Sequence, residues 1–152
     1  MIMKNNLYRA VYCSRCELIG APETITAELE SILTTSRRKN RPAGLTGALL
    51  FANNCFAQTL EGEREAVERC FERIQIDPRH SDVTVLEFGP AAERDFTEWS
   101  MAFVGNPSAT SPDPLAVALF KDIFAENHAD SGAKVLLLLR QLVHQEDLWA
   151  IA

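Results

Sequence analysis

The sequence predicts an α+β fold in which strands and helices follow the order β-α-β-β-α-β-β, with two more helices at the end of the chain. Apolar residues recur with helical spacing in two segments, from Thr24 to Lys39 and from Arg64 to Ile74. Segments rich in strand-forming residues precede, separate and follow these helices. This order is the ferredoxin-like arrangement, for which we expect a mixed five-stranded sheet with two helices on one face.

The first strand is predicted at residues 7–14, LYRAVYCS, where aromatic and β-branched residues favour an extended backbone. The first helix follows it. From Thr24 or Thr26, either of which can cap a helix, apolar residues recur at positions i, i+4, i+7 and i+8. Pro42 and Gly44 come after three basic residues and are expected to end this helix.

A β-hairpin is predicted over residues 45–62, because an Asn-Asn pair that tolerates positive φ separates two apolar segments. In the second strand, CFAQTLEG, Gln58 points to the same side as Phe56 and Leu60. Taken alone, this octapeptide is explained most simply by a glutamine that faces solvent. A buried amide would instead need partners for its two donor hydrogens and its acceptor oxygen.

The second helix is expected to end at Pro78, and two more strands are predicted at residues 83–88 and 96–104. Trp99 and Met101 share one face of the last strand, because side chains alternate along a strand. These two strands complete the predicted sheet.

The C-terminal third of the chain is predicted to be helical. A linker rich in Pro and Ser, residues 106–114, separates the sheet from two helices at 115–127 and 132–146. The second of these helices is apolar nearly all round at Val135–Leu139. We therefore expect it to be buried, either on the bare face of the sheet or against a second subunit.

Composition and charge narrow the range of functions. The 152 residues are enough for one domain with a hydrophobic core, which we place at residues 1–105, followed by a linker and helical extension at 106–152. Fifteen basic and 21 acidic residues give a net charge of −6, which argues against nucleic acid or an anionic membrane as the main partner. No apolar run approaches the roughly 20 residues that span a bilayer, and the N-terminus has no signal-peptide core. We expect a cytoplasmic protein.

Four cysteines include the motif Cys13-Ser14-Arg15-Cys16, which raises the hypothesis of a thiol-redox site. In thioredoxin-like sites the second cysteine lies in the first turn of a helix, which lowers the pKa of the first thiol. Here the helical pattern begins only near Thr24. No second C-x-x-C and no H-x3-5-H motif supplies the about four ligands of a zinc site, so no metal is expected.

Several polar residues lie at matching ends of adjacent predicted elements. Tyr12 is near the end of the first strand, Gln58 is in the hairpin, and Asn40 is near the end of the first helix. Ile32 and Ser36 precede Asn40 at helical spacing. Together these residues would line a cleft with few polar groups in apolar walls, which suits a flat heteroaromatic ligand.

Ligand binding is expected rather than catalysis. The chain has no G-x-G-x-x-G, P-loop or G-x-S-x-G motif, and no histidine has an evident nucleophile partner. Arg79 and His80 follow the second helix in a predicted loop, where the guanidinium is suited to hold a phosphate or a carbonyl group.

These residues stand in motifs that resemble one known family. LYRAVYCS, SRRKNRPAGLTGALLF, FAQTLEG, DPRHSDV and RDFTEWSMAF, in this order and spacing, are similar to the motifs of the BLUF domain, the blue-light sensor using flavin. The resemblance covers about residues 5–104. It is greatest to short, stand-alone members that have two C-terminal helices and no attached enzyme. It implies a non-covalent flavin, FAD, with FMN and riboflavin as alternatives.

The resemblance also implies roles for individual residues. The photoactive residues would be Tyr12, Gln58, Trp99 and Met101. The flavin contacts would be Ile32, Ser36, Asn40, Phe56, Gln58, Arg79 and His80. At the position before Asn40, where many members carry another polar uncharged residue or a histidine, this chain has Lys39.

In this family light would act through Tyr12 and Gln58. Tyr12 would give an electron and then a proton to the excited flavin through the amide of Gln58, and recombination would leave that amide rotated or tautomerised. No net reaction results, so the resemblance implies a switch and not an enzyme. The signal would leave through the last strand and the C-terminal helices to a separate effector protein.

Other interpretations stay open at this stage. The apolar run in the last helix predicts a homo-oligomer. One alternative function is a ferredoxin-like regulatory module that binds a colourless, non-flavin metabolite. The other is a small thiol-redox protein that uses Cys13 and Cys16.

Overall fold

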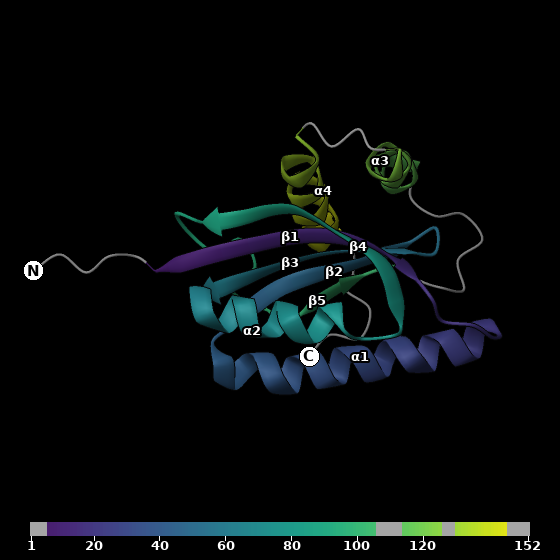
Figure 1. Cartoon of the computed structure of the whole chain (residues 1–152), viewed down its shortest axis with the longest axis horizontal. Coiled ribbons are helices and arrows are strands. Elements are labelled where there is room, and N and C mark those ends of the chain that lie inside the picture. Colours follow the sequence, from purple (N-terminus) through teal and green to yellow (C-terminus); the bar gives the residue numbers. More distant parts are fainter. Residues whose placement is uncertain (1–5, 106–113, 126–129, 146–152) are drawn as a thin grey trace, which may run out of the picture.

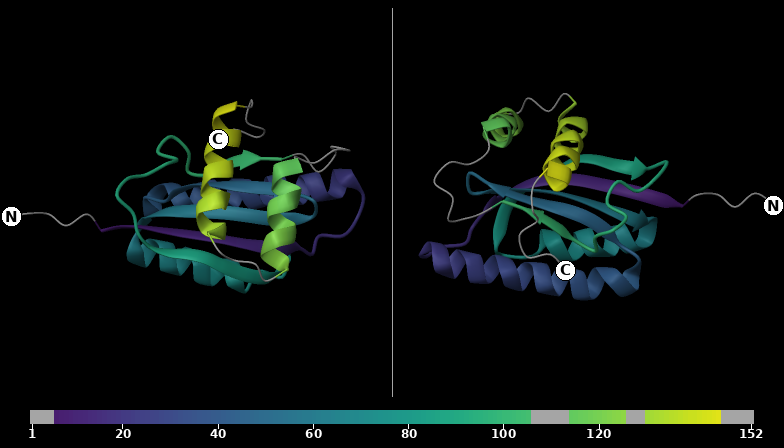
Figure 2. Two further views of the ribbon diagram at one scale, coloured as in Figure 1. Left: turned by 90° about the horizontal axis from the view of Figure 1, so that it is seen from above. Right: turned by 180° about the vertical axis from the view of Figure 1, so that it is seen from behind.

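The computed structural model describes residues 6–105, 114–125 and 130–145, and over these ranges it has the predicted α+β fold. The elements are β1 (Leu7–Cys16), α1 (Pro22–Ala43), β2 (Thr46–Ala52), β3 (Cys55–Glu63), α2 (Arg64–Gln75), β4 (His80–Pro90), β5 (Ala102–Val104), α3 (Pro114–Phe124) and α4 (Ser131–Gln145). Figure 1 shows α1 and α2 on one face of the sheet and α3 and α4 on the other. The views in Figure 2 show that α3 and α4 run across the strands.

The sheet has five strands in the order β4-β1-β3-β2-β5. Neighbouring strands are antiparallel except β2 and β5, which are parallel, so the sheet is mixed as predicted. The hairpin turn is confirmed at Asn53 and Asn54, whose φ angles are 50° and 60°. In the register of β1 and β3, Tyr12 lies directly opposite Gln58. The fold therefore places a phenol beside an amide near the centre of the sheet.

Side chains that alternate along the strands form two hydrophobic cores, one on each face of the sheet. The α1/α2 core contains Ala10, Cys16, Leu29, Leu33, Leu45, Leu49, Phe51, Phe56, Leu60, Ala66, Val67, Cys70, Met101 and Phe103. The α4 core includes Val11, Cys13, Ala57, Phe96, Phe120, Ile123, Val135, Leu136, Leu138, Leu139, Leu142 and Val143. The sheet is thus buried on both faces, and its two faces meet different helices.

Helix α1 begins earlier than the apolar pattern predicts. Its first residue is Pro22 and not Thr24, because proline already has the φ of a first helical turn and needs no N–H partner there. The helix includes Pro42 in its last turn, so this proline does not end it as predicted. The helix ends at Ala43, and the N–H of the left-handed Gly44 (φ 71°) caps it by donating to the carbonyl groups of Asn40 and Arg41. Helix α2 ends at Gln75, before the predicted stop.

The last strand is shorter than predicted, and the prediction that Trp99 and Met101 share one face of it is wrong. Both residues precede β5, which contains only Ala102–Val104. Met101 is buried in the α1/α2 core, whereas Trp99 packs against the α4 core. The reason is that the backbone N–H of Phe96 binds the carboxylate of Glu61 (2.7 Å) and not a neighbouring strand. This hydrogen bond takes the place of strand pairing at residue 96, where the last strand was predicted to begin.

Helix α4 covers the face of the sheet that α1 and α2 leave bare, which is one of the two locations that the sequence allows. Within Val135–Leu139 only Leu137 is exposed, at 53%. Of the predicted linker, only Pro114 lies in the described residues, as the first residue of α3. No helix in the described ranges is long and apolar enough to cross a membrane. The division of the chain at residue 105 stays a prediction.

Candidate functional site

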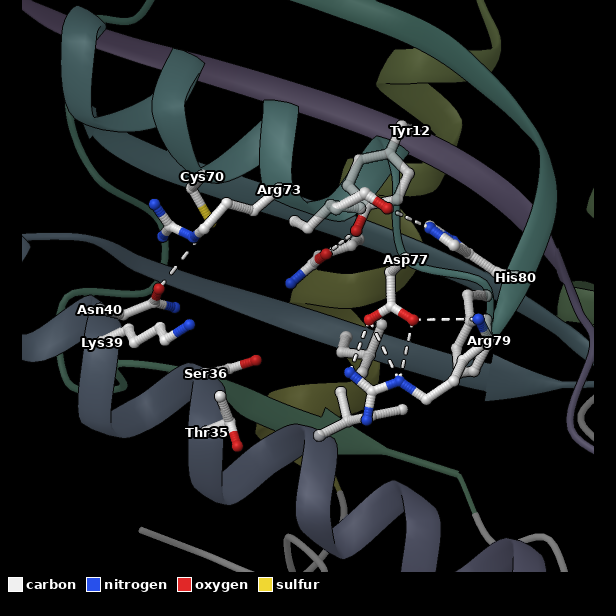
Figure 3. A pocket seen from close by; sticks show the side chains of 15 residues that line it. Tyr12, Thr35, Ser36, Lys39, Asn40, Cys70, Arg73, Asp77, Arg79 and His80 are labelled. Atoms are coloured by element: carbon white, nitrogen blue, oxygen red, sulfur yellow. Dashed lines mark hydrogen bonds and ion pairs between the residues drawn. The ribbon is translucent and has the colours of Figure 1, made fainter.

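A pocket of about 210 Å³ lies between α1 and α2, over the central strands (Figure 3). Its lining residues are Tyr12, Ile32, Thr35, Ser36, Lys39, Asn40, Leu49, Phe56, Gln58, Cys70, Arg73, Ile74, Asp77, Arg79 and His80. All of the flavin contacts that the sequence predicts are among them, together with Tyr12. Trp99 and Met101 do not line the pocket.

The Gln58 amide is buried, and both of its ends have partners. Its Oε1 accepts a hydrogen bond from the Tyr12 hydroxyl, and its Nε2 donates to the Sδ of Met101 at 3.3 Å. Tyr12, Gln58 and Met101 are 3%, 5% and 0% exposed. The interpretation of a solvent-facing glutamine is therefore wrong. Because a thioether sulfur is a weak acceptor, the amide is held more firmly at its oxygen than at its nitrogen.

Burial sets the protonation state of Tyr12. Burial, and to a lesser degree the nearby Cys70, Cys13 and Asp77, raises the pKa of the phenol well above its usual value. The ring of Phe71 on α2 packs on the tyrosine with 5.3 Å between ring centroids. The phenol is therefore a neutral hydrogen-bond donor at physiological pH.

Two side chains of α1 fasten the segment that leads into β5. Asn40 Nδ2 donates to the carbonyl of Ser100 (2.8 Å), and Arg37 Nε donates to the carbonyl of Met101 (2.9 Å). The Oδ1 of Asn40 faces the thiol of Cys70 at 3.9 Å. Asn40 therefore lines the pocket and also fixes the backbone next to the methionine.

At one end of the pocket Arg79 is paired with Asp77, a residue that the sequence analysis missed. Arg79 Nε and Nη2 donate to the carboxylate at 2.5–3.1 Å. The hydrogen bonds from Arg79 hold the pKa of Asp77 below its usual value, so the carboxylate stays ionised. Asp77 also accepts from the backbone N–H of Arg79 (2.9 Å), a turn that an Asp two residues before another residue often forms. The position of Asp77 two residues before Arg79 could therefore have identified it from the sequence.

His80 begins β4 instead of lying in a loop, and both of its ring nitrogens contact protein. Nε2 lies 2.5 Å from the carbonyl of Ile74, which assigns the proton to this nitrogen, and Nδ1 lies 2.7 Å from the hydroxyl of Ser14. The ring packs edge-on against Tyr12 and Phe56. His80 thus lines the pocket with its ring and ties the end of α2 to β1.

The end of the pocket opposite Arg79 is basic (Figure 3). Lys39 of α1 and Arg73 of α2 lie there, near Asn40 and Cys70. Their charges oppose the effect of burial, which raises the pKa of the Cys70 thiol. Arg73 is exposed, and the packing of α2 beside α1 brings it to the pocket.

The remaining lining residues that the sequence analysis missed are Thr35, Leu49 and Ile74. Leu49 lies opposite Gln58 in the register of β2 and β3. Strand register and helical spacing could have found these residues, because each is a neighbour of a predicted site residue on the same surface.

Cys13 and Cys16 do not form a redox pair in this fold. They lie on opposite faces of the sheet, Cys13 in the α4 core and Cys16 in the α1/α2 core. Burial raises the pKa of both thiols and so disfavours the reactive thiolate. In the ranges that the structure describes, no cluster of His, Cys, Asp or Glu could hold a metal ion.

The pocket fits a flavin. Ile32, Phe56 and Ile74 give it apolar walls for a flat ring system, and the amides of Gln58 and Asn40 offer donors and acceptors to a polar ring edge. Lys39 and Arg73, at the end of the pocket opposite Arg79, match the charge of a phosphorylated tail.

Comparison with known proteins tests this assignment. A family model described as sensors of blue-light using FAD matches residues 7–102. The chain is 43% identical over 89 residues to the photoactivated adenylate cyclase subunit beta of Euglena gracilis, a match that covers 58% of this chain and 10% of that protein. For the subunit alpha of the same organism the identity is 36% over 101 residues. The chain spans about a tenth of the length of these curated relatives.

Solved structures match nearly the whole chain. The photo-activated state of BlsA has a TM-score of 0.71 and 31% identity, and the match covers 93% of this chain and 97% of that chain. The dark-state structure of BlrB, a BLUF protein, has a TM-score of 0.68 and 30% identity, with 91% and 95% covered. The chain therefore belongs to the BLUF family, the blue-light sensors that use FAD.

Proposed function

We propose that this BLUF photoreceptor switches through Tyr12 and Gln58, with Met101 as the first residue to respond. The observation that carries the proposal is the Gln58 amide, which is bonded at Oε1 to Tyr12 and at Nε2 to Met101. An amide has its donor and its acceptor at opposite ends, so a half-turn exchanges what each neighbour is offered. Glutamate and leucine do not have this property.

The switch needs no net reaction. When bound, a flavin would supply the absorption of blue light and the electron acceptor. Tyr12 would give up an electron and then its phenolic proton, which would leave through the Gln58 amide along the existing hydrogen bond to Oε1. On return of the electron and the proton to Tyr12, Gln58 would keep a turned amide. The two states then differ only in hydrogen bonds.

The pocket residues would contact different parts of the flavin. We assign Asn40 and Arg79 to polar contacts with the ring edge, and Ile32, Ser36, Phe56 and His80 to the walls. FAD is the flavin that we expect, as the family description indicates. FMN is the alternative, because a BlrP1 structure from Klebsiella pneumoniae is described with FMN.

We further propose that the chain signals to a separate effector protein and is not itself an enzyme. In support, BlsA and BlrB are matched over 97% and 95% of their own chains. We also propose a cytoplasmic location, a homo-oligomer, and no role for nucleic acid or a membrane as partner, the last from the net charge of −6.

The test is an absorption spectrum of the purified protein before and after blue light. We expect the yellow colour of a non-covalent oxidised flavin, a small red shift of its main bands on illumination, and recovery in the dark. A protein that stays colourless after flavin is added would contradict the proposal. It would instead favour a module that binds a colourless metabolite.

A further inference from the structure

A second polar network lies on the face of the sheet opposite the pocket. Glu61 on β3 is fully buried, and its carboxylate accepts hydrogen bonds from the hydroxyl of Thr46 (3.0 Å) and from the backbone N–H groups of Asp95 (2.8 Å) and Phe96 (2.7 Å). These bonds fix the start of residues 95–101, which we call the bridge segment. They are charge-assisted and shielded from water, so they form a firm anchor.

The side chain of Asp95 connects the bridge segment to α4. Its two carboxylate oxygens accept hydrogen bonds from Nε and Nη2 of Arg140, each at 2.8 Å. One oxygen also accepts a bond from Arg9 of β1 at 2.6 Å. The parallel pair of bonds fixes orientation as well as distance. One carboxylate thus joins β1, the bridge segment and the C-terminal helix.

The other end of the bridge segment contacts the photoactive glutamine. The Sδ of Met101 accepts a hydrogen bond from Gln58, and its carbonyl accepts one from Arg37. Between the two ends, Phe96 and Trp99 pack in or against the α4 core. A short piece of chain therefore has Gln58 at one end and α4 at the other.

We propose that Asp95 is a positioning residue for the light response. Its ion pair with Arg140 holds α4 in its dark-state position, and this ion pair changes when the Gln58 amide turns. The inference rests on the proposed function. A turned amide presents its oxygen to the Met101 sulfur, and because both atoms are acceptors their contact is lost. Buried bonds to Glu61 hold the backbone of Asp95 and Phe96 in place. The displacement therefore changes the ion pair between the Asp95 side chain and Arg140, which is the weaker interaction because the Arg140 side chain is 43% exposed and its charge is screened by water.

The test compares two α4 variants in the full, flavin-loaded chain. Arg140→Gln removes the bond to Asp95, and Lys134→Gln removes the same charge from an exposed position on the same helix. Hydrogen exchange of residues 131–145 is measured in the dark and under blue light, together with the absorption spectrum.

For Arg140→Gln we expect dark-state exchange in α4 about two- to fivefold faster than in the unmodified protein, the range for an exposed ion pair. The light-minus-dark difference in α4 should shrink, while the red shift is unchanged. Asp95→Asn should act in the same direction and more strongly, because it also removes the charge with which Arg9 pairs at 2.6 Å. Lys134→Gln should leave both measurements unchanged, and Arg140→Lys should restore part of the difference.

Two results would overturn the proposal. One is equal acceleration of exchange in the dark and in the light, with the difference intact, which would mean that Arg140 only stabilises α4. The other is a normal red shift in the unmodified protein with identical α4 exchange in both states. The absence of any red shift would instead contradict the proposed function, so the two failures are distinguishable.

Discussion

Two buried polar residues of β3, Gln58 and Glu61, lie on opposite faces of the sheet and have opposite kinds of surroundings. Glu61 is 0% exposed and accepts bonds from a hydroxyl and two backbone N–H groups, with Arg9 3.7 Å away. Gln58 is 5% exposed and has two side-chain partners, one of which is a thioether. One strand thus carries both a fixed anchor and a group that is able to turn.

The difference follows from the chemistry of the two side chains. A buried carboxylate is stable only when several donors compensate its charge, so its geometry is fixed by all of them together. A buried amide is neutral, and a weak acceptor such as sulfur leaves its nitrogen end loosely held. A turned arrangement is therefore easier for the Gln58 amide than for the Glu61 carboxylate to adopt. The predictions below test this contrast.

The largest effect is expected for the anchor. Glu61→Ala leaves the Thr46 hydroxyl and two backbone N–H groups without their acceptor and removes the carboxylate that lies 3.7 Å from Arg9, so the free energy of unfolding should fall by about 3–5 kcal/mol. Chemical denaturation measures this change, and Glu63→Ala, at the exposed end of the same strand, is the matched control. A loss below about 1 kcal/mol would show that Glu61 is not an anchor.

For the switch, a large functional effect should accompany a small change in stability. Gln58→Leu keeps the apolar volume but leaves the Tyr12 hydroxyl without its acceptor, so we expect a loss of about 1–2 kcal/mol in the free energy of unfolding. The bound flavin should remain and the normal red shift should vanish. Tyr12→Phe should also keep the fold and abolish the response. A normal photocycle in either variant would disprove the assigned roles.

Met101→Leu removes only the weak hydrogen-bond acceptor of Gln58, the sulfur of Met101, and so tests whether the loosely held end of the amide matters. Leucine has a similar volume and no sulfur acceptor, so stability should change by less than about 1.5 kcal/mol. The red shift should persist in size, because Tyr12 and Gln58 are intact. Light-dependent hydrogen exchange at residues 95–104 should decrease. An unchanged exchange difference would mean that the signal does not pass through the methionine.

The smallest effect is expected for the cysteines of β1. Cys13→Ser/Cys16→Ser should purify with bound flavin and show the normal red shift, with at most a changed rate of dark recovery. The physical reason is that the two buried thiols lie on opposite faces of the sheet and have raised pKa values. Loss of the whole light response would restore the thiol hypothesis.

Much of the site could be predicted because its residues lie on regular elements. Ile32, Ser36 and Asn40 share one face of a helix, and Tyr12 and Gln58 lie on neighbouring strands, so local periodicity brings them together. The last strand was predicted, but its start was placed too early, because the apolar pattern of residues 96–101 also fits a paired strand. The buried carboxylate of Glu61, distant in sequence, instead binds the backbone N–H groups of Asp95 and Phe96 at the predicted start of the strand.

The sequence by itself determined the order of strands and helices, the family, and the pocket residues that repeat with the period of their own element. These depend on local spacing, which a single segment contains. Only the tertiary structure decided that Gln58 bonds to Met101, that Trp99 packs on the opposite face, and that Asp95 joins α4 to the sheet. Each of these depends on residues about 40 or more positions apart in the sequence, whose approach is set by the packing of whole elements and not by any local pattern.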